Sequence, residues 1–228
     1  MKKLIVFGAL FSLFAAYSCS TMRKINQDNL YNRHNEAKAK VKKGLFSSMT
    51  VSFGNYSTGK KEKGVDKHII NFRDQSNPFN FSLNDNSGNI TSVQAVYTQK
   101  KDLSVNNLPD FINDMNDGAS VYYSWIRAGS ANTLQNWELI LKNPTYDGLK
   151  QDAQTGVLQT SNQIITVHAH NRFGSPDSYE NMCYEFQLQG VPVAAVQVNG
   201  KNKVWMEKQL DPSVKFVIAG AIASILMR

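Results

Sequence analysis

The sequence has few cysteines and lacks the short motifs that identify the common catalytic sites. It contains two cysteines, four histidines and six prolines in 228 residues. It has no G-x-S-x-G nucleophile elbow, phosphate-binding loop, paired-cysteine motif or H-E-x-x-H zinc motif. Two cysteines cannot build a disulfide framework. We therefore expect a protein without a metal or a cofactor, whose function is binding rather than catalysis.

The charge of the chain is unevenly distributed. The formal net charge is +7, and between residues 23 and 67 eleven basic residues stand against four acidic ones. From residue 68 to the end, twelve basic residues face fourteen acidic ones. The basic character therefore belongs to the N-terminal part and not to a nucleic-acid-binding domain, so we expect no nucleic-acid partner.

The N-terminus, "MKKLIVFGALFSLFAAYSC", has the layout of an export signal. A basic start is followed by an apolar stretch of about 13 residues, which is shorter than the roughly 20 residues that span a membrane. A signal that ends on cysteine resembles bacterial lipoprotein signals, here with the loose consensus familiar from Bacteroidota. The resemblance implies a signal peptide over residues 1–18, lipidation of Cys19 and a lipid-anchored envelope protein at the outer membrane. Plain secretion and a retained anchor are the alternatives.

Residues 19–47 form a basic stem in this interpretation. Asp28 can cap a helix, the lysines near Lys42 suit its C-terminal end, and Gly44 can terminate it. The stem is thus expected to contain a short helix. Because it follows a lipid anchor, its positive charge predicts attraction to anionic lipid head groups. A solvated basic stalk is the alternative.

Residues 48–228 are expected to form a single β-rich domain. Alternating apolar segments recur at intervals of mostly 8 to 15 residues, and turn formers such as "NDNSGN" and Asn199-Gly200 separate them. About eleven or twelve strands are predicted, with a short helix at "LPDFINDMND". This spacing is typical of an antiparallel barrel or sandwich.

The chain closes with an apolar helix predicted over residues 212–227. Asp211 is a good N-cap and Pro212 suits the first helical position. The apolar run from Phe216 to Met227 is about 12 residues, or about 18 Å, against a hydrocarbon thickness of about 30 Å. Apolar side chains occupy every side of this helix, so we expect it to be buried within protein.

Three segments together resemble the tubby-like C-terminal fold, which is shared by tubby proteins, phospholipid scramblases and LURP-one-related proteins. They are "FSLNDNSGNITSVQAVY", "YEFQLQGVPVAAVQV" and "LDPSVKFVIAGAIASILM". The resemblance implies a mainly β fold, an antiparallel closed barrel of about twelve strands around a buried hydrophobic C-terminal helix. A β-sandwich is the alternative. No counterpart of tubby's basic phosphoinositide site or of a scramblase calcium segment can be placed on this sequence, so the resemblance implies no ligand.

One candidate patch lies on the segment "ITVHAHNR". On a strand, His168, His170 and Arg172 share one face. Two imidazoles at this spacing can chelate zinc or copper, but a third ligand is needed and the neighbouring Arg172 disfavours a cation. An anion site is the other functional alternative. We favour the interpretation that the three form part of the polar outer face of a barrel wall.

The remaining chemistry-bearing residues favour structural roles. Cys183 lies in the strand-like "MCYEFQL", where a buried wall residue is more usual than a nucleophile. Trp125, Trp137 and Trp205 lie in separate strands and are expected to pack in the core. The leading hypothesis is therefore a non-enzymatic, lipid-anchored binding or interaction module for a lipid, a protein or an envelope polymer. A glycan-binding or glycan-hydrolysing β-sandwich lipoprotein is the alternative.

Overall fold

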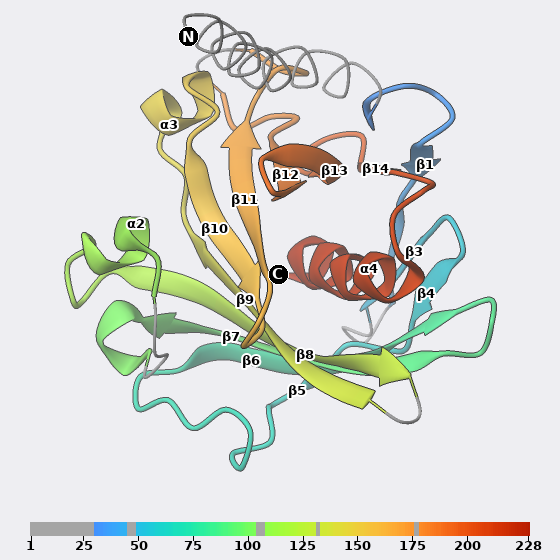
Figure 1. Cartoon of the computed structure of the whole chain (residues 1–228). Helices are drawn as coiled ribbons and strands as arrows, with labels where there is room; N and C mark the ends of the chain where they lie inside the picture. Colours follow the sequence, from blue (N-terminus) through green and yellow to red (C-terminus); the bar gives the residue numbers. More distant parts are fainter. Residues whose placement is uncertain (1–29, 45–48, 104–107, 131–132, 176–177) are drawn as a thin grey trace, which may run out of the picture.

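The strands form one antiparallel sheet that curls around a single helix (Figure 1). The computed structural model describes residues 30–44, 49–103, 108–130, 133–175 and 178–228. The strands are β1 (Glu36–Lys38), β2 (Lys40–Lys43), β3 (Met49–Phe53), β4 (Tyr56–Thr58), β5 (Glu62–Lys63), β6 (Ser76–Asp85), β7 (Ile90–Gln99), β8 (Ser120–Ser130), β9 (Thr133–Lys142), β10 (Gln154–Gln159), β11 (Ile164–His170), β12 (Cys183–Leu188), β13 (Val191–Gln197) and β14 (Lys203–Met206). The helical segments are η1 (Lys100–Asp102), α2 (Asp110–Asn113), α3 (Tyr146–Lys150) and α4 (Pro212–Met227).

The two ends of the sheet come together at one residue. Within the described residues the strand order is β1-β14-β13-β12-β11-β10-β9-β8-β7-β6-β4-β3-β2, and β5 adds to β6 beside this path. Strand β1 pairs with β14 and β2 pairs with β3, and Ala39 alone separates β1 from β2. The sheet is therefore nearly closed into a barrel. The predicted mainly β, antiparallel barrel with a C-terminal helix is confirmed.

Alternation along the strands builds the barrel wall as predicted. In β6, Phe79, Phe81 and Leu83 are buried in the core, and the residues between them face outward. At the tip of the β6–β7 hairpin, the Asp85 carboxylate accepts hydrogen bonds from the backbone N–H groups of Ser87 and Asn89, each at 2.9 Å. The cluster of turn formers thus holds a hairpin.

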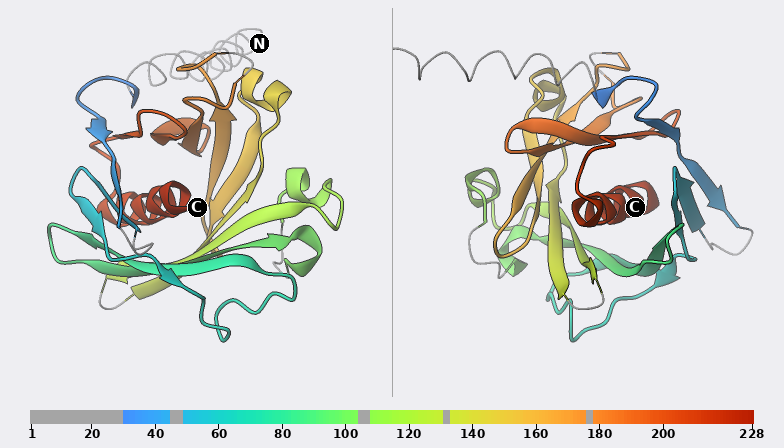
Figure 2. Two further views of the ribbon diagram at one scale, coloured as in Figure 1. Left: turned by 180° about the vertical axis from the view of Figure 1, so that it is seen from behind. Right: turned by 45° about the vertical axis from the view of Figure 1, so that its right-hand side comes forward.

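Helix α4 has the predicted bounds and lies inside the ring of strands (Figure 2). It contacts β3, β6, β7, β8 and β13, and every residue from Phe216 to Met227 is buried. In the ranges that the structure describes, we find no helix with both the length and the apolar character needed to cross a membrane. The all-round apolar surface of α4 is accounted for by the walls around it.

Small residues let α4 approach the sheet closely. A Cβ placed on Gly220 would lie 3.1 Å from Cγ2 of Ile126 in β8. The buried Ser224 hydroxyl is 2.9 Å from the Ser124 hydroxyl, and the Tyr122 hydroxyl donates to the Ser224 carbonyl at 3.0 Å. Because these polar groups are paired, the helix fits without a buried unsatisfied hydroxyl.

The cap of α4 supports a stability prediction. The Asp211 carboxylate accepts hydrogen bonds from the Ser213 hydroxyl and from the backbone N–H groups of Ser213 at 2.9 Å and Val214 at 3.3 Å. The bond from the Ser213 hydroxyl, followed by the two backbone bonds, holds the pKa of Asp211 below the usual range. We expect Asp211→Ala to lower the stability by about 1 kcal/mol, and Asp211→Asn, which keeps an accepting oxygen, to lower it less. Thermal unfolding followed by circular dichroism at neutral pH measures both. Equal melting temperatures for the wild type and Asp211→Ala would contradict this role.

The basic stem differs from the prediction. Where the short helix was expected to continue to Gly44, residues 36–43 form β1 and β2 instead. Local charge and capping signals favoured a helix. The backbone instead pairs with β14 through β1 and with β3 through β2, and these two strands would otherwise have an unpaired edge. The N-terminal part of the expected helix, the signal over 1–18 and Cys19 lie outside the described residues.

Candidate functional site

The structure places the three residues of the predicted patch on the outside of the barrel. His168 and His170 project from the outer face of β11. The residues that alternate with them, Ile165, Val167 and Ala169, belong to the core. Their surroundings differ from an open polar face, because His170 is completely buried.

The cover over His170 comes from the segment that precedes β1. The Tyr31 hydroxyl lies 2.9 Å from His170 Nε2 and donates a short hydrogen bond to Glu185. The Tyr31 ring packs edge-on against Trp205 and Phe173, with centroid distances of 5.3 Å in both pairs. The patch therefore docks the N-terminal segment onto the barrel wall.

Two carboxylates balance the positive charge of the patch, one from the turn before β10 and one from β12. Arg172 donates to the Asp152 carboxylate at 2.7 Å, and its guanidinium lies 4.0 Å from Glu185. Burial, followed by the charge of Arg172, lowers the pKa of His170 to about 4, so the imidazole is neutral near neutral pH. With a neutral His170 imidazole and with Arg172 engaged by Asp152, these two residues offer no unpaired cation to an anion.

The thiol of Cys183 is part of the same wall. Cys183 is fully buried opposite His170 in the β11–β12 ladder, and burial raises the pKa of its thiol. A protonated, enclosed thiol is a poor nucleophile. Among the described residues, no three His, Cys, Asp or Glu side chains come together as ligands for a metal ion.

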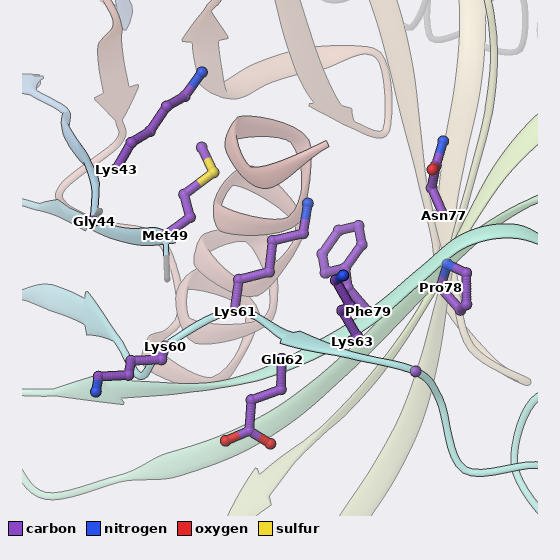
Figure 3. Close-up of a pocket in the computed structure, with 11 residues that line it drawn as sticks. Lys43, Gly44, Met49, Lys60, Lys61, Glu62, Lys63, Asn77, Pro78 and Phe79 are labelled. Atoms are coloured by element: carbon purple, nitrogen blue, oxygen red, sulfur yellow. The ribbon is translucent and has the colours of Figure 1, made fainter. Parts of the chain in front are cut away.

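A different site opens beside the C-terminal end of α4 (Figure 3). It is a cavity of about 850 Å³. Its lining comes from the end of β2, the start of β3, the β4–β6 connection and β6, and consists of Lys43, Gly44, Met49, Lys60, Lys61, Glu62, Lys63, Gly64, Asn77, Pro78 and Phe79.

Strand alternation explains which lysines face this cavity. Ala39 and Val41 of the β1–β2 strand pack on the core, so Lys43 continues the inward series, whereas Lys38, Lys40 and Lys42 are exposed outside. Figure 3 shows the Lys43 side chain extending upward past Met49, with its ammonium group apart from that of Lys61. Of the four lysines in β1 and β2, Lys43 therefore lines the pocket and the other three lie on the outer surface.

Lys61 lines the pocket and contacts the C-terminal end of α4. Its ammonium group donates a hydrogen bond to the Met227 carbonyl oxygen and lies 4.0 Å from the centroid of the Phe79 ring. This places a positive charge at the negative end of the helix dipole. Burial, followed by repulsion from Lys43, lowers the pKa of Lys61. The positive charges of Lys43 and Lys61 therefore both act on this pocket, which favours an anion there.

The pocket combines this charge with an apolar floor. Met49 and Phe79 supply the floor, and Figure 3 shows that the acidic side chain of Glu62 points away from them. In the part of the chain that the structure describes, Lys43, Lys60 and Lys63 form no ion pair. Positive charge above apolar surface suits an anion that carries a hydrocarbon portion.

The pattern of single segments does not reveal this pocket. The charged stretch "GNYSTGKKEKG" is typical of a solvated hairpin loop, and Lys43 lies in the segment expected to be a helix. Had the stem been assigned as a strand, its period of two would have marked Lys43 as inward. Glu185 could likewise have been found from alternation, because it faces His168 across the ladder.

Comparisons with known proteins leave this chain without a match. No known protein-family model, curated protein or solved structure is significantly similar to it. The functional argument therefore rests on the geometry of the pocket.

Proposed function

We propose that the protein is a non-enzymatic, lipid-anchored binding protein of the cell envelope, and that the pocket between Lys43 and Phe79 binds an anionic amphiphile. The observation that carries this proposal is that Lys43 and Lys61 line one pocket together with the apolar side chains of Met49 and Phe79.

The expected binding free energies favour an amphiphile over a small anion as the ligand. An exposed ion pair contributes about 0 to 1 kcal/mol in water. Each buried methylene contributes about 0.8 kcal/mol, so eight of them contribute about 6 kcal/mol. The hydrocarbon portion would supply most of the affinity, and the lysines would select the sign of the head group.

The anchoring part of the proposal rests on the sequence of the signal. Lipidation of Cys19 would leave eleven residues to Leu30, which reach about 40 Å at most. Docking of Tyr31 on β12 and β14 would then hold the barrel near the membrane surface. The exposed Lys38, Lys40 and Lys42 would face anionic head groups there. The tubby-like resemblance stays a proposal about the fold family and implies no ligand.

A head-group comparison tests the pocket. We expect the full chain carrying Cys19→Ala to bind dodecanoate, but not dodecyltrimethylammonium, in isothermal titration calorimetry below the micelle concentration of each. Lys43→Met keeps an apolar side chain of similar length and removes the charge. We expect it to weaken dodecanoate binding about tenfold, as for the loss of one charge-assisted hydrogen bond.

The matched control lies one residue away. Lys42→Met removes the same charge from the outer face and is expected to leave the affinity for dodecanoate unchanged. Equal binding of the two amphiphiles, or the same loss in both lysine variants, would show that the pocket does not select an anion.

A further inference from the structure

A second hollow lies on the outer wall of the barrel, away from the lysine pocket. It has a volume of about 750 Å³. It crosses β8 to β12 and includes the β10–β11 turn, and its lining consists of Trp125, Asn136, Glu138, Gln159, Thr160, Ser161, Asn162, Gln163, Ile164, Leu188 and Gln189. We call it the outer groove.

The strand register builds the floor of the outer groove from one row of residues. Trp125 pairs with Glu138, Glu138 pairs with Gln159, and Gln159 pairs with Ile164. The next residue along each of β8, β9 and β11 belongs to the core inside the barrel, so this row faces outward. Four neighbouring strands thus present an indole, a carboxylate, an amide and an aliphatic side chain side by side.

Gln159 is the most informative member of the row. Its residue is only 7% exposed, yet its side-chain amide forms no hydrogen bond within the described part of the protein. Among the described residues, the side-chain polar atoms that are both fully buried and without a hydrogen-bond partner are His170 Nδ1 and Trp205 Nε1, so the amide atoms of Gln159 are not fully buried. The Gln159 amide therefore retains a small accessible surface, and this surface faces the groove. A nearly buried amide without a protein partner needs one from outside.

The neighbouring polar groups are available to the same ligand. The side chains of Asn136 and Gln163 form no hydrogen bond within the described ranges. Glu138 accepts a hydrogen bond from the Tyr123 hydroxyl at 2.7 Å through one carboxylate oxygen, and this bond orients the other oxygen. Amides both donate and accept, so the groove can bind groups that do the same.

We propose that the outer groove binds a neutral saccharide. Hydroxyl groups both donate to and accept from amides and carboxylates, and the C–H face of a sugar ring packs on an indole such as Trp125. No lysine or arginine lines the groove, which disfavours an anionic ligand. A peptide added as a strand would need a free sheet edge, whereas β8 to β11 are paired on both sides.

The groove binds the saccharide without cleaving it. Hydrolysis of a glycosidic bond uses two carboxyl groups on opposite sides of that bond. Glu138 is the one acidic residue among the residues that line the groove. This proposal concerns a site separate from the anionic pocket and does not depend on it.

Titration with neutral oligosaccharides tests the proposal. We expect at least one of maltotriose, cellotriose and N,N′,N″-triacetylchitotriose to bind the full chain carrying Cys19→Ala, measured by tryptophan fluorescence and calorimetry at concentrations up to about 10 mM. Trp125→Ala is expected to lower the affinity at least tenfold. Gln159→Leu has a similar shape, removes only the hydrogen-bonding groups, and is expected to lower the affinity about tenfold.

Two controls keep the result interpretable. Gln209→Leu makes the same substitution at an exposed turn outside the groove and is expected to leave the affinity unchanged. Trp125→Ala and Gln159→Leu should keep the wild-type circular dichroism spectrum and unfold cooperatively on heating. Failure of all three oligosaccharides to bind, or binding that is unchanged in both groove variants, would overturn the proposal.

Discussion

Replacing Ile222 with aspartate is expected to unfold the domain. Ile222 is completely buried on α4, and the strands of the barrel surround that helix. The change removes a buried aliphatic side chain and introduces a charge without a partner, which together cost about 5 to 10 kcal/mol. This is comparable with the whole stability of a typical domain, about 5 to 15 kcal/mol. Chemical denaturation followed by circular dichroism and tryptophan fluorescence measures the loss.

Two variants separate this result from a general effect of mutation. Ile90→Asp introduces the same charge at a residue that is 70% exposed, and we expect little change in stability. Ile222→Val removes one methylene and is expected to cost about 1 kcal/mol. A soluble Ile222→Asp variant that unfolds cooperatively near the wild-type midpoint would be incompatible with a core helix.

Replacing Cys19 with alanine is expected to move the protein from the membrane fraction to the soluble fraction. Lipidation requires the cysteine sulfur, and we expect the acyl chains on it to provide most of the membrane affinity. The measurement is fractionation of cells by ultracentrifugation, with metabolic labelling by a palmitate analogue to detect the lipid.

The second cysteine supplies the control for this experiment. Cys183 is buried in the wall, so Cys183→Ala should leave both the labelling and the membrane fraction unchanged. If the Cys19→Ala variant stayed in the membrane fraction in full, the anchor would have to be another feature of the chain.

The terminal helix shows what local sequence can predict. Its cap at Asp211, its bounds and its burial all agree with the prediction, because a side chain that accepts from the next N–H groups and an apolar surface on every side are properties of the segment itself. Its function as the centre of a barrel was predicted only through a resemblance. Periodicity alone left a sandwich open, because both architectures use the same alternating strands.

The stem shows where local reasoning fails. The caps at Asp28 and Gly44 and the lysines before Gly44 favour a helix, whereas the alternation of apolar and charged residues between Glu36 and Lys43 favours a strand. Pairing with β14 on one side and β3 on the other decides between them, and those partners lie far away in the sequence.

The candidate sites depend even more on distant contacts. A period of two places His168 and His170 on one outer face, as expected, but their neighbours Tyr31 and Glu185 come from other parts of the chain. These neighbours turn an open patch into a covered docking point. The lysine pocket and the outer groove are likewise assembled from several strands, and each contains residues that look ordinary in their own segments.

The sequence by itself determined the strand-rich character from β3 onward, turns such as the β6–β7 hairpin tip and the buried terminal helix, since each depends on periodicity and capping within a few residues. Only the tertiary structure decided that β1 and β2 close the barrel, that Lys43 and Lys61 line one pocket with an apolar floor, and that Gln159 lines an outer groove. The physical reason is that register and closure bring together side chains that are separated along the chain, and no local pattern encodes which of them become neighbours.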